Sequence, residues 1–476
     1  MKLRNCAAVC VLTILASRTT GAQDDVSARI AGAAMTNGGA SVFLQKLTDS
    51  VGGRVTGSRE LRAASELILS TLKDAGYANA RFEEYPLESR WTRGSISGRV
   101  TSPIDRAITI GSYAWVPGTA GPIAAPLVDI GAPASAALPV PAERVRGAAV
   151  LVDPQKVGVD PSFVARAALA RSLADAGATA MLIPSDKPGR MVYTSAFGFY
   201  PKAPLPVISV ARPDALLLRR LLAKGPVKLA LDVRNTFDTS PYRERNVIAD
   251  LPGRDPGEVV LLGAHYDSWD PAEGADDDGS GVAAVLEAAR ILKSLGIPPK
   301  RTIRFAFFSG EEEATLGSRA YVATHEKELD SLKAVLVMDS GAGAPRGVEL
   351  HGRADLEAPM KKVVAPLASL GAAFTTLEAS FDRDHGPFMV VGVPAMTLWV
   401  EAGTYDERHH TVIDTFDGVD PRWLAADTAV MGILAWELAN ASEPVGRRLS
   451  PAEAEALLKS SGVESTKRMV YGASAR

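Results

Sequence analysis

Apolar runs alternate with amphipathic segments along the second half of the chain. Five runs predict buried strands, at residues 246–251, 259–263, 301–308, 334–339 and 395–400. Residues 280–295 instead show apolar positions at helical spacing and stop at Gly296. Strands of continuous apolar residues that alternate with helices indicate a mostly parallel sheet covered on both faces. The predicted fold class is therefore α/β, with a three-layer architecture.

The first part of the chain predicts a helix and then a strand. Ser58 is placed to cap a helix whose apolar positions continue to Leu72 and which ends at Gly76. Residues 81–87 follow as a strand. This segment would belong to the same domain as the second half.

A change of composition marks residues 101–231. The segment is rich in Pro, Ala and Gly and contains no histidine. Short β-like runs occur at 148–152 and 205–210, and one helix is predicted at 163–176. We interpret the segment as a β-rich unit inserted between two parts of a larger domain.

The N-terminus has the layout of a secretory signal peptide over residues 1–22. Lys2 and Arg4 precede an apolar stretch at 6–16, which is too short for the ~20 residues that a membrane span needs. Both cysteines, Cys6 and Cys10, fall within it. The mature protein would then be exported to the periplasm or the exterior, without disulfides or a cysteine nucleophile.

Composition narrows the function classes. The net charge of −3 over 476 residues provides no basic field for nucleic acid or an anionic membrane. No G-x-S-x-G elbow is present, so a serine hydrolase lacks its nucleophile. The tail at 446–476 is polar, with a short helix signal at 451–459 and no assigned function.

Acidic and imidazole side chains follow the ends of the predicted elements in the second half. They are His265, Asp277, Glu311, Glu312, Asp339 and His410. Ligands of such sheets gather at the carboxyl ends of the strands. Two imidazoles with a bridging and two further carboxylates suit a pair of zinc ions, and a neighbouring free glutamate supplies a general base. A metal-dependent hydrolase is the leading interpretation.

Residues beside these ligands have simpler expected roles. Asp267 lies two positions after His265 and is expected to accept its second imidazole N–H, which fixes the tautomer. Of the three aspartates at 276–278, one would bridge the metals while the others form a solvated turn or cap a helix. Glu313 fits the first turn of a helix, where the helix dipole favours an acid.

The motifs resemble the co-catalytic di-zinc exopeptidases, the family of the bacterial leucyl aminopeptidases and plasma glutamate carboxypeptidase (carboxypeptidase Q). The carboxypeptidase Q-like motifs are HYDSWD (265–270), GADDDGSG (274–281), PKRTIRFAFFSGEE (299–312), HHTVIDT (409–415) and DSVGGRVTGSRE (49–60). The middle segment resembles a protease-associated domain through VRGAAVLVDP (145–154), LADAGATAMLI (173–183) and PLPVISVARPDALLL (204–218). The resemblance implies a phosphorylase/hydrolase-like fold, with peptidase-domain parts at 23–100 and 232–445 around the inserted domain at 101–231.

The resemblance also implies the role of each site residue. Asp277 would bridge two Zn²⁺ ions, with His265 and Asp339 on one ion, and Glu312 and His410 on the other. Aligned on the downstream residues 316–318, Glu311 becomes the base and Glu313 a helix residue, although Ala314 and Thr315 stand where the family has a glycine and an apolar residue. Asp384 and His385 resemble a family loop near the substrate, in which Arg383 replaces a serine.

The expected function is that of a secreted metallo-exopeptidase. Negative charge at Glu311 and Asp339 would attract a free α-amino group, so the bond beside an N-terminal residue of a dipeptide or short peptide would be cleaved. Two alternatives stay open: a di-zinc amidohydrolase for acylated amino acids or cell-wall peptides, and a non-catalytic receptor-like binding protein. Expected partners are short peptides, with no nucleic acid and no membrane span, and a homodimer is left open.

Overall fold

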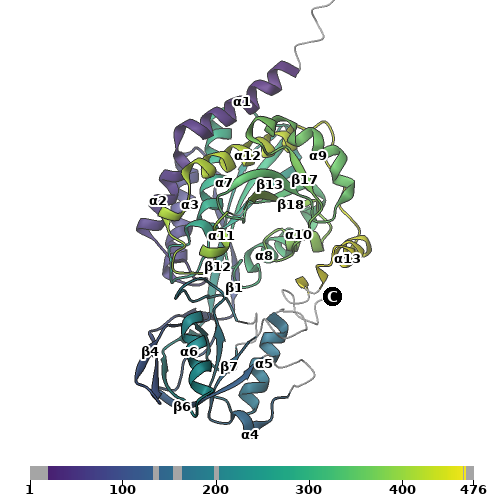
Figure 1. Cartoon of the computed structure of the whole chain (residues 1–476). Helices are drawn as coiled ribbons and strands as arrows, with labels where there is room; N and C mark the ends of the chain where they lie inside the picture. Colours follow the sequence, from purple (N-terminus) through teal and green to yellow (C-terminus); the bar gives the residue numbers. More distant parts are fainter. Residues whose placement is uncertain are drawn as a thin grey trace, which may run out of the picture.

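A computed structural model describes residues 20–131, 139–153, 163–197, 203–401, 403–464 and 466–467. Within this part of the chain, two eight-stranded sheets form the centres of two separate units, and a two-stranded sheet connects these units (Figure 1). The predicted signal peptide lies outside the described residues except for its last positions, where helix α1 (Thr20–Asn37) begins. None of the described helices has the length and hydropathy needed to cross a membrane.

The main sheet combines a parallel centre with antiparallel edges. Its strands, in spatial order, are β1 (Arg81–Leu87), β12 (Tyr242–Leu251), β14 (Arg301–Phe308), β13 (Asp255–His265), β15 (Leu332–Val337), β18 (Ala395–Glu401), β16 (Ala344–Glu349) and β17 (Phe374–Thr376). The central strands β14, β13, β15 and β18 are parallel to their neighbours in that group. Antiparallel pairing attaches β12 to β14 and β16 to β18. The edge pair of β16 and β17 is again parallel. The expected mostly parallel sheet is therefore present, with antiparallel pairings toward its edges, as is common in large α/β sheets.

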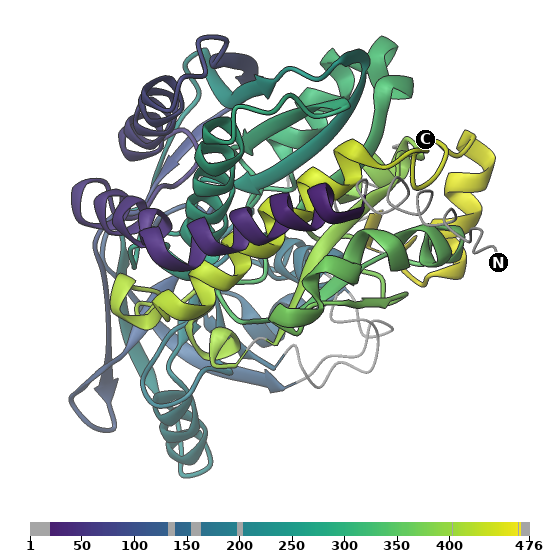
Figure 2. The same ribbon diagram turned by 90° about the horizontal axis from the view of Figure 1, so that it is seen from above.

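Helices cover both faces of the main sheet, as the alternation of buried strand residues requires. Val260 and Leu262 of β13 pack in one core, whereas Val259 and Leu261 pack in the other. The first core contains α1, α2 (Gly39–Ser50), α3 (Arg59–Asp74), α7 (Ser280–Ser294), α9 (Glu357–Val364) and α12 (Pro421–Asn440). The second contains α8 (Leu316–Thr324), α10 (Gly386–Val390) and α13 (Pro451–Ser460). Figures 1 and 2 show this three-layer arrangement.

Two of these helices illustrate what the sequence pattern does and does not contain. Helix α3 begins after Ser58, whose hydroxyl accepts the N–H of Leu61 at 3.0 Å, as the capping signal predicts. Helix α12 was not predicted, because it is buried on nearly all sides against α1 and α7 and shows no separate polar face. The short helix predicted in the tail is present as α13, and it packs on the main unit through Leu458.

The inserted unit, residues 96–233, is built on the second eight-stranded sheet. Its strands, in spatial order, are β4 (Arg106–Ile108), β3 (Ile96–Ser102), β10 (Lys228–Val233), β6 (Ile123–Gly131), β7 (Ala149–Val152), β8 (Ala180–Pro184), β9 (Val207–Val210) and β5 (Ile110–Ser112). Strands β6 to β9 are parallel, and α5 (Phe163–Asp175) and α6 (Arg212–Leu222) pack on opposite faces. The unit is thus itself α/β, and its sheet extends slightly beyond the predicted limits of 101–231.

A narrow neck joins the inserted unit to the main unit, which comprises the rest of the described chain. The neck strands β2 (Arg90–Thr92) and β11 (Thr236–Asp238) pair antiparallel, so the chain enters and leaves the insertion side by side. Three tryptophans, Trp91, Trp115 and Trp269, form a buried cluster beside the neck with residues of both units. This cluster fixes the inserted unit against the end of the main sheet where the candidate ligands lie.

Candidate metal centre

The predicted ligands converge at one edge of the main sheet. His265 ends β13, while Glu311 and Asp339 follow the neighbouring parallel strands β14 and β15. Parallel neighbours deliver their carboxyl ends to the same edge, which explains this proximity. Asp277 comes from the loop before α7, and His410 follows the short helix α11 (Tyr405–Arg408).

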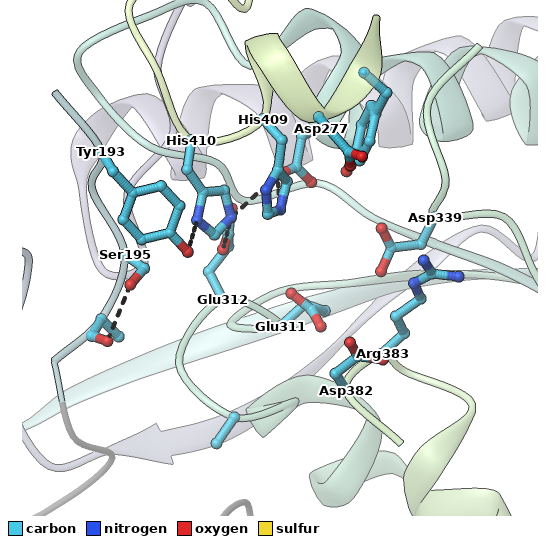
Figure 3. A pocket seen from close by; sticks show the side chains of 14 residues that line it. Tyr193, Ser195, Asp277, Glu311, Glu312, Asp339, Asp382, Arg383, His409 and His410 are labelled. Atoms are coloured by element: carbon cyan, nitrogen blue, oxygen red, sulfur yellow. Dashed lines mark hydrogen bonds and ion pairs between the residues drawn. The ribbon is translucent and has the colours of Figure 1, made fainter. Parts of the chain in front are cut away.

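Asp277 lies between the two imidazoles. Its Oδ1 is 3.2 Å from His265 Nε2, and its Oδ2 is 3.2 Å from His410 Nε2. Glu312 Oε2 lies 3.0 Å from His410 Nε2, and Asp339 Oδ1 lies 3.7 Å from His265 Nε2 (Figure 3). These contacts divide the side chains into two groups that share the Asp277 carboxylate, one around His265 and one around His410. Glu311 also lies close to His265 and Asp339, and His409 lies close to Asp277 and His410.

The chemistry of this cluster fits divalent cations. Burial raises the pKa of Glu311 well above its usual range and that of Glu312 to about 7, because nearby carboxylates are crowded in a site with little water. His265 Nε2 and Glu312 Oε1 are buried without a well-aligned hydrogen bond to any described residue, although Asp277 Oδ1 lies 3.2 Å from His265 Nε2. Imidazole nitrogens and carboxylate oxygens with free lone pairs are the donor set that zinc prefers.

Asp267 orients the neighbouring segment as well as the imidazole. His265 Nδ1 lies 3.1 Å from the Asp267 backbone oxygen and 3.6 Å from its carboxylate. That carboxylate accepts the backbone N–H of Glu311 at 3.2 Å and of Glu312 at 3.1 Å, and the hydroxyl of Thr56 at 3.3 Å. Asp267 is thus a positioning residue, which ties the two glutamates to the end of β13.

The aspartates that flank Asp277 do not form a solvated turn. Asp276 and Asp278 are fully buried. Asp276 accepts hydrogen bonds from the guanidinium of Arg408 and from a backbone N–H. Asp278 accepts the N–H of His265 and of Gly281, each at 3.1 Å, so it caps the first turn of α7. The helix-cap alternative is therefore the correct one for Asp278, and the solvated-turn expectation was wrong for both residues.

Glu313 is not a helix residue, contrary to expectation. Helix α8 begins only at Leu316, and Glu313 is buried with its Oε1 accepting the indole N–H of Trp115 at 2.7 Å. The chain turns sharply in between, since Ala314 and Thr315 have φ values of 79° and 55°. Positive φ is the conformation that glycine tolerates best. The acidic residue serves the contact with the inserted unit rather than the helix dipole.

Asp384 and His385 lie below the cavity rather than on its wall. Both are fully buried, and burial raises the pKa of Asp384 to about 8 and lowers that of His385 to about 4. His385 stacks on His351, with 4.0 Å between ring centroids. The adjacent Asp382 and Arg383 line the cavity instead. Asp382 and Arg383 are therefore the residues of this loop that face the cavity.

A cavity of about 340 Å³ opens over the cluster and is bounded by both units. The inserted unit contributes Tyr193 and Ser195 to its wall (Figure 3). His409 also lines it, stacked on His410 at 3.7 Å and with Nε2 3.5 Å from Asp277 Oδ2. The histidine doublet was the sequence signal for His409, whereas Tyr193 had none.

Comparison with known proteins agrees with this geometry. Residues 246–434 match the model of peptidase family M28, a span that contains every predicted metal ligand. The segment that carries the candidate ligands is thus a peptidase M28 domain. The M28 peptidase is 28% identical to carboxypeptidase Q from Xenopus laevis over 419 residues, which cover 85% of the chain and 86% of that relative.

Solved structures extend the comparison of this M28 peptidase to the fold. A peptidase M28 precursor from Shewanella amazonensis matches with a TM-score of 0.80 and 25% identity, over 91% of this chain and all of the other. A zinc aminopeptidase from Bacillus subtilis shares the fold with a TM-score of 0.67 at 22% identity, over 87% and 97% of the two chains. The α/β fold and the family resemblance are thus confirmed, and the protein is a zinc-dependent metallopeptidase.

Proposed function

We propose that this M28 peptidase removes the N-terminal residue from dipeptides and short peptides, using two zinc ions. The observation that carries the proposal is the position of Asp277, whose two oxygens each lie 3.2 Å from an imidazole Nε2. A carboxylate shared in this way is the hallmark of a paired metal site. His265 and Asp339 would complete the first position, and Glu312 and His410 the second.

The residues around the ions have separable tasks in hydrolysis. When bound, zinc ions supply a Lewis acid for the scissile carbonyl and make water more acidic. Glu311 faces the cavity with its Oε2 3.9 Å from His265 Nε2. We assign it the role of general base, which takes a proton from water and returns it to the leaving amine. Asp267 holds Glu311 in place through the backbone N–H.

The cavity favours small substrates with a free amino group. Asp339, Asp382 and Glu311 line it and would attract a cationic α-amine. The inserted unit also bounds this cavity. We propose that the inserted unit is a protease-associated domain and that it restricts the length of the peptide that can enter. On the pattern of residues 1–22 we also propose export of the mature protein.

Arg383 gives one observation in favour of a second function. Its guanidinium donates to Ser340 Oγ at 3.1 Å, lies 3.9 Å from Glu349 and lines the same cavity. A cation there would suit a substrate carboxylate, as in acylated amino acids or cell-wall peptides, whose α-amine is blocked. The choice between the two functions therefore depends on the free amine.

The test is a substrate panel with the zinc-loaded mature protein. Free dipeptides, longer peptides and amino-acetylated dipeptides of the same sequence are compared by kcat/KM. We expect free dipeptides to be hydrolysed and their acetylated forms to be inert. Faster turnover of the acetylated forms would overturn the exopeptidase proposal in favour of the amidohydrolase. Hydrolysis within long peptides would contradict both.

A further inference from the structure

We infer that the inserted unit contributes to metal binding, because it holds His410 in the orientation that a zinc ligand needs. Zinc binding at the His410 position and docking of the inserted unit would then be coupled. The inference rests on the proposed role of His410 as a zinc ligand. It goes further in assigning a positioning residue, Tyr193, and a consequence for metal affinity.

Two consecutive residues of the inserted unit contact His410. The hydroxyl of Tyr193 lies 3.1 Å from His410 Nδ1 (Figure 3). The backbone N–H of Thr194 donates to the His410 carbonyl at 3.0 Å. The rings of Tyr193 and His410 also pack with 5.3 Å between centroids. Both the side chain and the backbone of one candidate ligand are therefore fixed by a segment more than two hundred residues earlier in the chain.

The contacts matter because His410 adopts a costly backbone conformation. Its φ is +61°, in the left-handed region, which costs a non-glycine residue about 1–2 kcal/mol. With Nδ1 occupied by the Tyr193 hydroxyl, Nε2 is left to face Asp277 and Glu312. A hydrogen bond from the far ring nitrogen fixes the tautomer that a metal requires. Without it, both the rotation of the ring and its proton position lose a constraint.

The segment that carries His410 is held from both sides. We call residues 405–410 the strap. On the side of the inserted unit, the ammonium of Lys187 donates to the backbone oxygen of Asp406. On the other side, the guanidinium of Arg408 donates to the Asp276 carboxylate, next to the shared Asp277. The strap thus connects the inserted unit to the acidic loop of the metal cluster.

Coupling follows from linkage. If docking of the inserted unit raises zinc affinity by ordering the strap, zinc must favour docking by the same factor. Loss of a partner that orients a metal-binding histidine typically lowers metal affinity by roughly 10–100-fold. We expect this effect at one of the two zinc positions, since Tyr193 contacts only the His410 group.

Zinc affinity of Tyr193→Phe, measured by competition with a chromogenic chelator, tests the inference without substrate. Tyr113→Phe is the matched control, because Tyr113 is a buried neighbour whose ring lies 6.0 Å from that of Tyr193. We expect Tyr193→Phe to weaken one zinc by about 10-fold or more and Tyr113→Phe to leave both unchanged. Equal affinities in the wild type and both variants would overturn the inference.

Two further measurements keep the outcome interpretable. Lys187→Met removes a strap contact without touching His410 and should weaken the same zinc in the same direction. Hydrogen exchange over residues 187–197 should slow when zinc is added to the wild type, and much less in Tyr193→Phe. If His410→Ala retains both zinc ions, the proposed ligand set fails. If it loses one zinc while Tyr193→Phe and Lys187→Met lose none, only the coupling fails.

Discussion

Glu312 and His410 approach each other to 3.0 Å between Oε2 and Nε2. The preceding Glu311 faces the other imidazole, with 3.9 Å from its Oε2 to His265 Nε2. Two adjacent glutamates therefore serve different halves of the centre. The shorter contact supports our proposal that Glu312 is a metal ligand and Glu311 the general base.

Glu311→Gln should therefore lower kcat by roughly 10²–10⁴, the usual contribution of a positioned general base. Its zinc content and KM should change little, because the amide keeps the shape of the side chain. Glu312→Gln should instead lose one zinc ion. Kinetics and elemental analysis of the two variants measure both effects. Exchanged phenotypes would mean that the two roles are assigned the wrong way round.

The shared position of Asp277 predicts the metal stoichiometry. Zinc-loaded protein should retain two ions per chain after dialysis, and Asp277→Asn should retain less than one because it weakens both positions at once. Asp382→Asn is the matched control, since Asp382 lines the cavity but belongs to neither ligand group. A wild-type stoichiometry of one, or an Asp277→Asn variant that keeps one tight ion, would contradict the paired site.

The backbone conformation of Ala314 leads us to predict that a glycine at this position stabilises the protein. Its φ of 79° lies in the left-handed region, where a non-glycine residue loses about 1–2 kcal/mol. Ala314→Gly removes that strain, while glycine costs about 0.5–1 kcal/mol more chain entropy. The zinc-loaded variant should gain on the order of 0.5–1 kcal/mol, seen as a higher midpoint of thermal unfolding.

The contrast for Ala314→Gly is a glycine placed in a helix. Ala456 is exposed in α13, so Ala456→Gly should destabilise the protein by about 1 kcal/mol. A fall in stability for both variants would show that the Ala314 methyl group contributes more through packing than it costs through strain.

The contact between His325 and Glu83 should make a pH-dependent contribution to the stability of the protein. Its Nε2 lies 2.9 Å from Glu83, and this hydrogen bond raises the pKa of His325. Although burial alone would raise the pKa of Glu83, the contact with His325 holds it below its usual value. Between about pH 4.5 and about pH 6.5 the pair contributes fully. The contribution is lost as the pH rises through the raised pKa of His325, and also as the pH falls through the lowered pKa of Glu83.

His325→Gln should therefore cost on the order of 1–3 kcal/mol near pH 5.5, and less at alkaline pH. Chemical unfolding at several pH values measures the difference. Glu328→Gln is the control, because the second partner of His325 is exposed and should matter little. A cost that is the same at pH 5.5 and pH 9 would show that the His325 contact is not an ion pair.

The sequence predicted the centre of the main sheet because its strands are largely continuous apolar runs, as in residues 334–338. Antiparallel edges such as β1 and β16 depend on which strand lies beside them, which local periodicity does not encode. Helix α12 has no polar face, so it had no helical period to detect. The antiparallel edges and helix α12 were not predicted for the same reason: both are determined by tertiary packing and not by the local sequence pattern.

The candidate ligands were found because each follows the end of an element and the motifs are specific. Their supporting contacts were not found. The Trp115–Glu313 and Tyr193–His410 pairs join residues from different units. Only docking of the inserted unit creates such pairs, and neither partner belongs to a motif that predicts the other.

Because the neck strands β2 and β11 pair with each other, the inserted unit could be exchanged as one piece, a cassette, without changing the path of the main chain. Next to them, the N–H of Arg234 donates to the oxygen of Ser95 at 3.0 Å, so the incoming and outgoing chains already lie one ladder step apart. A hairpin turn of about two residues could close this gap and leave the main sheet with its present strand order. Evolution or a protein engineer could thus exchange the cassette without rerouting the chain. Any successor would have to bring its own partners for His410 Nδ1 and Glu313.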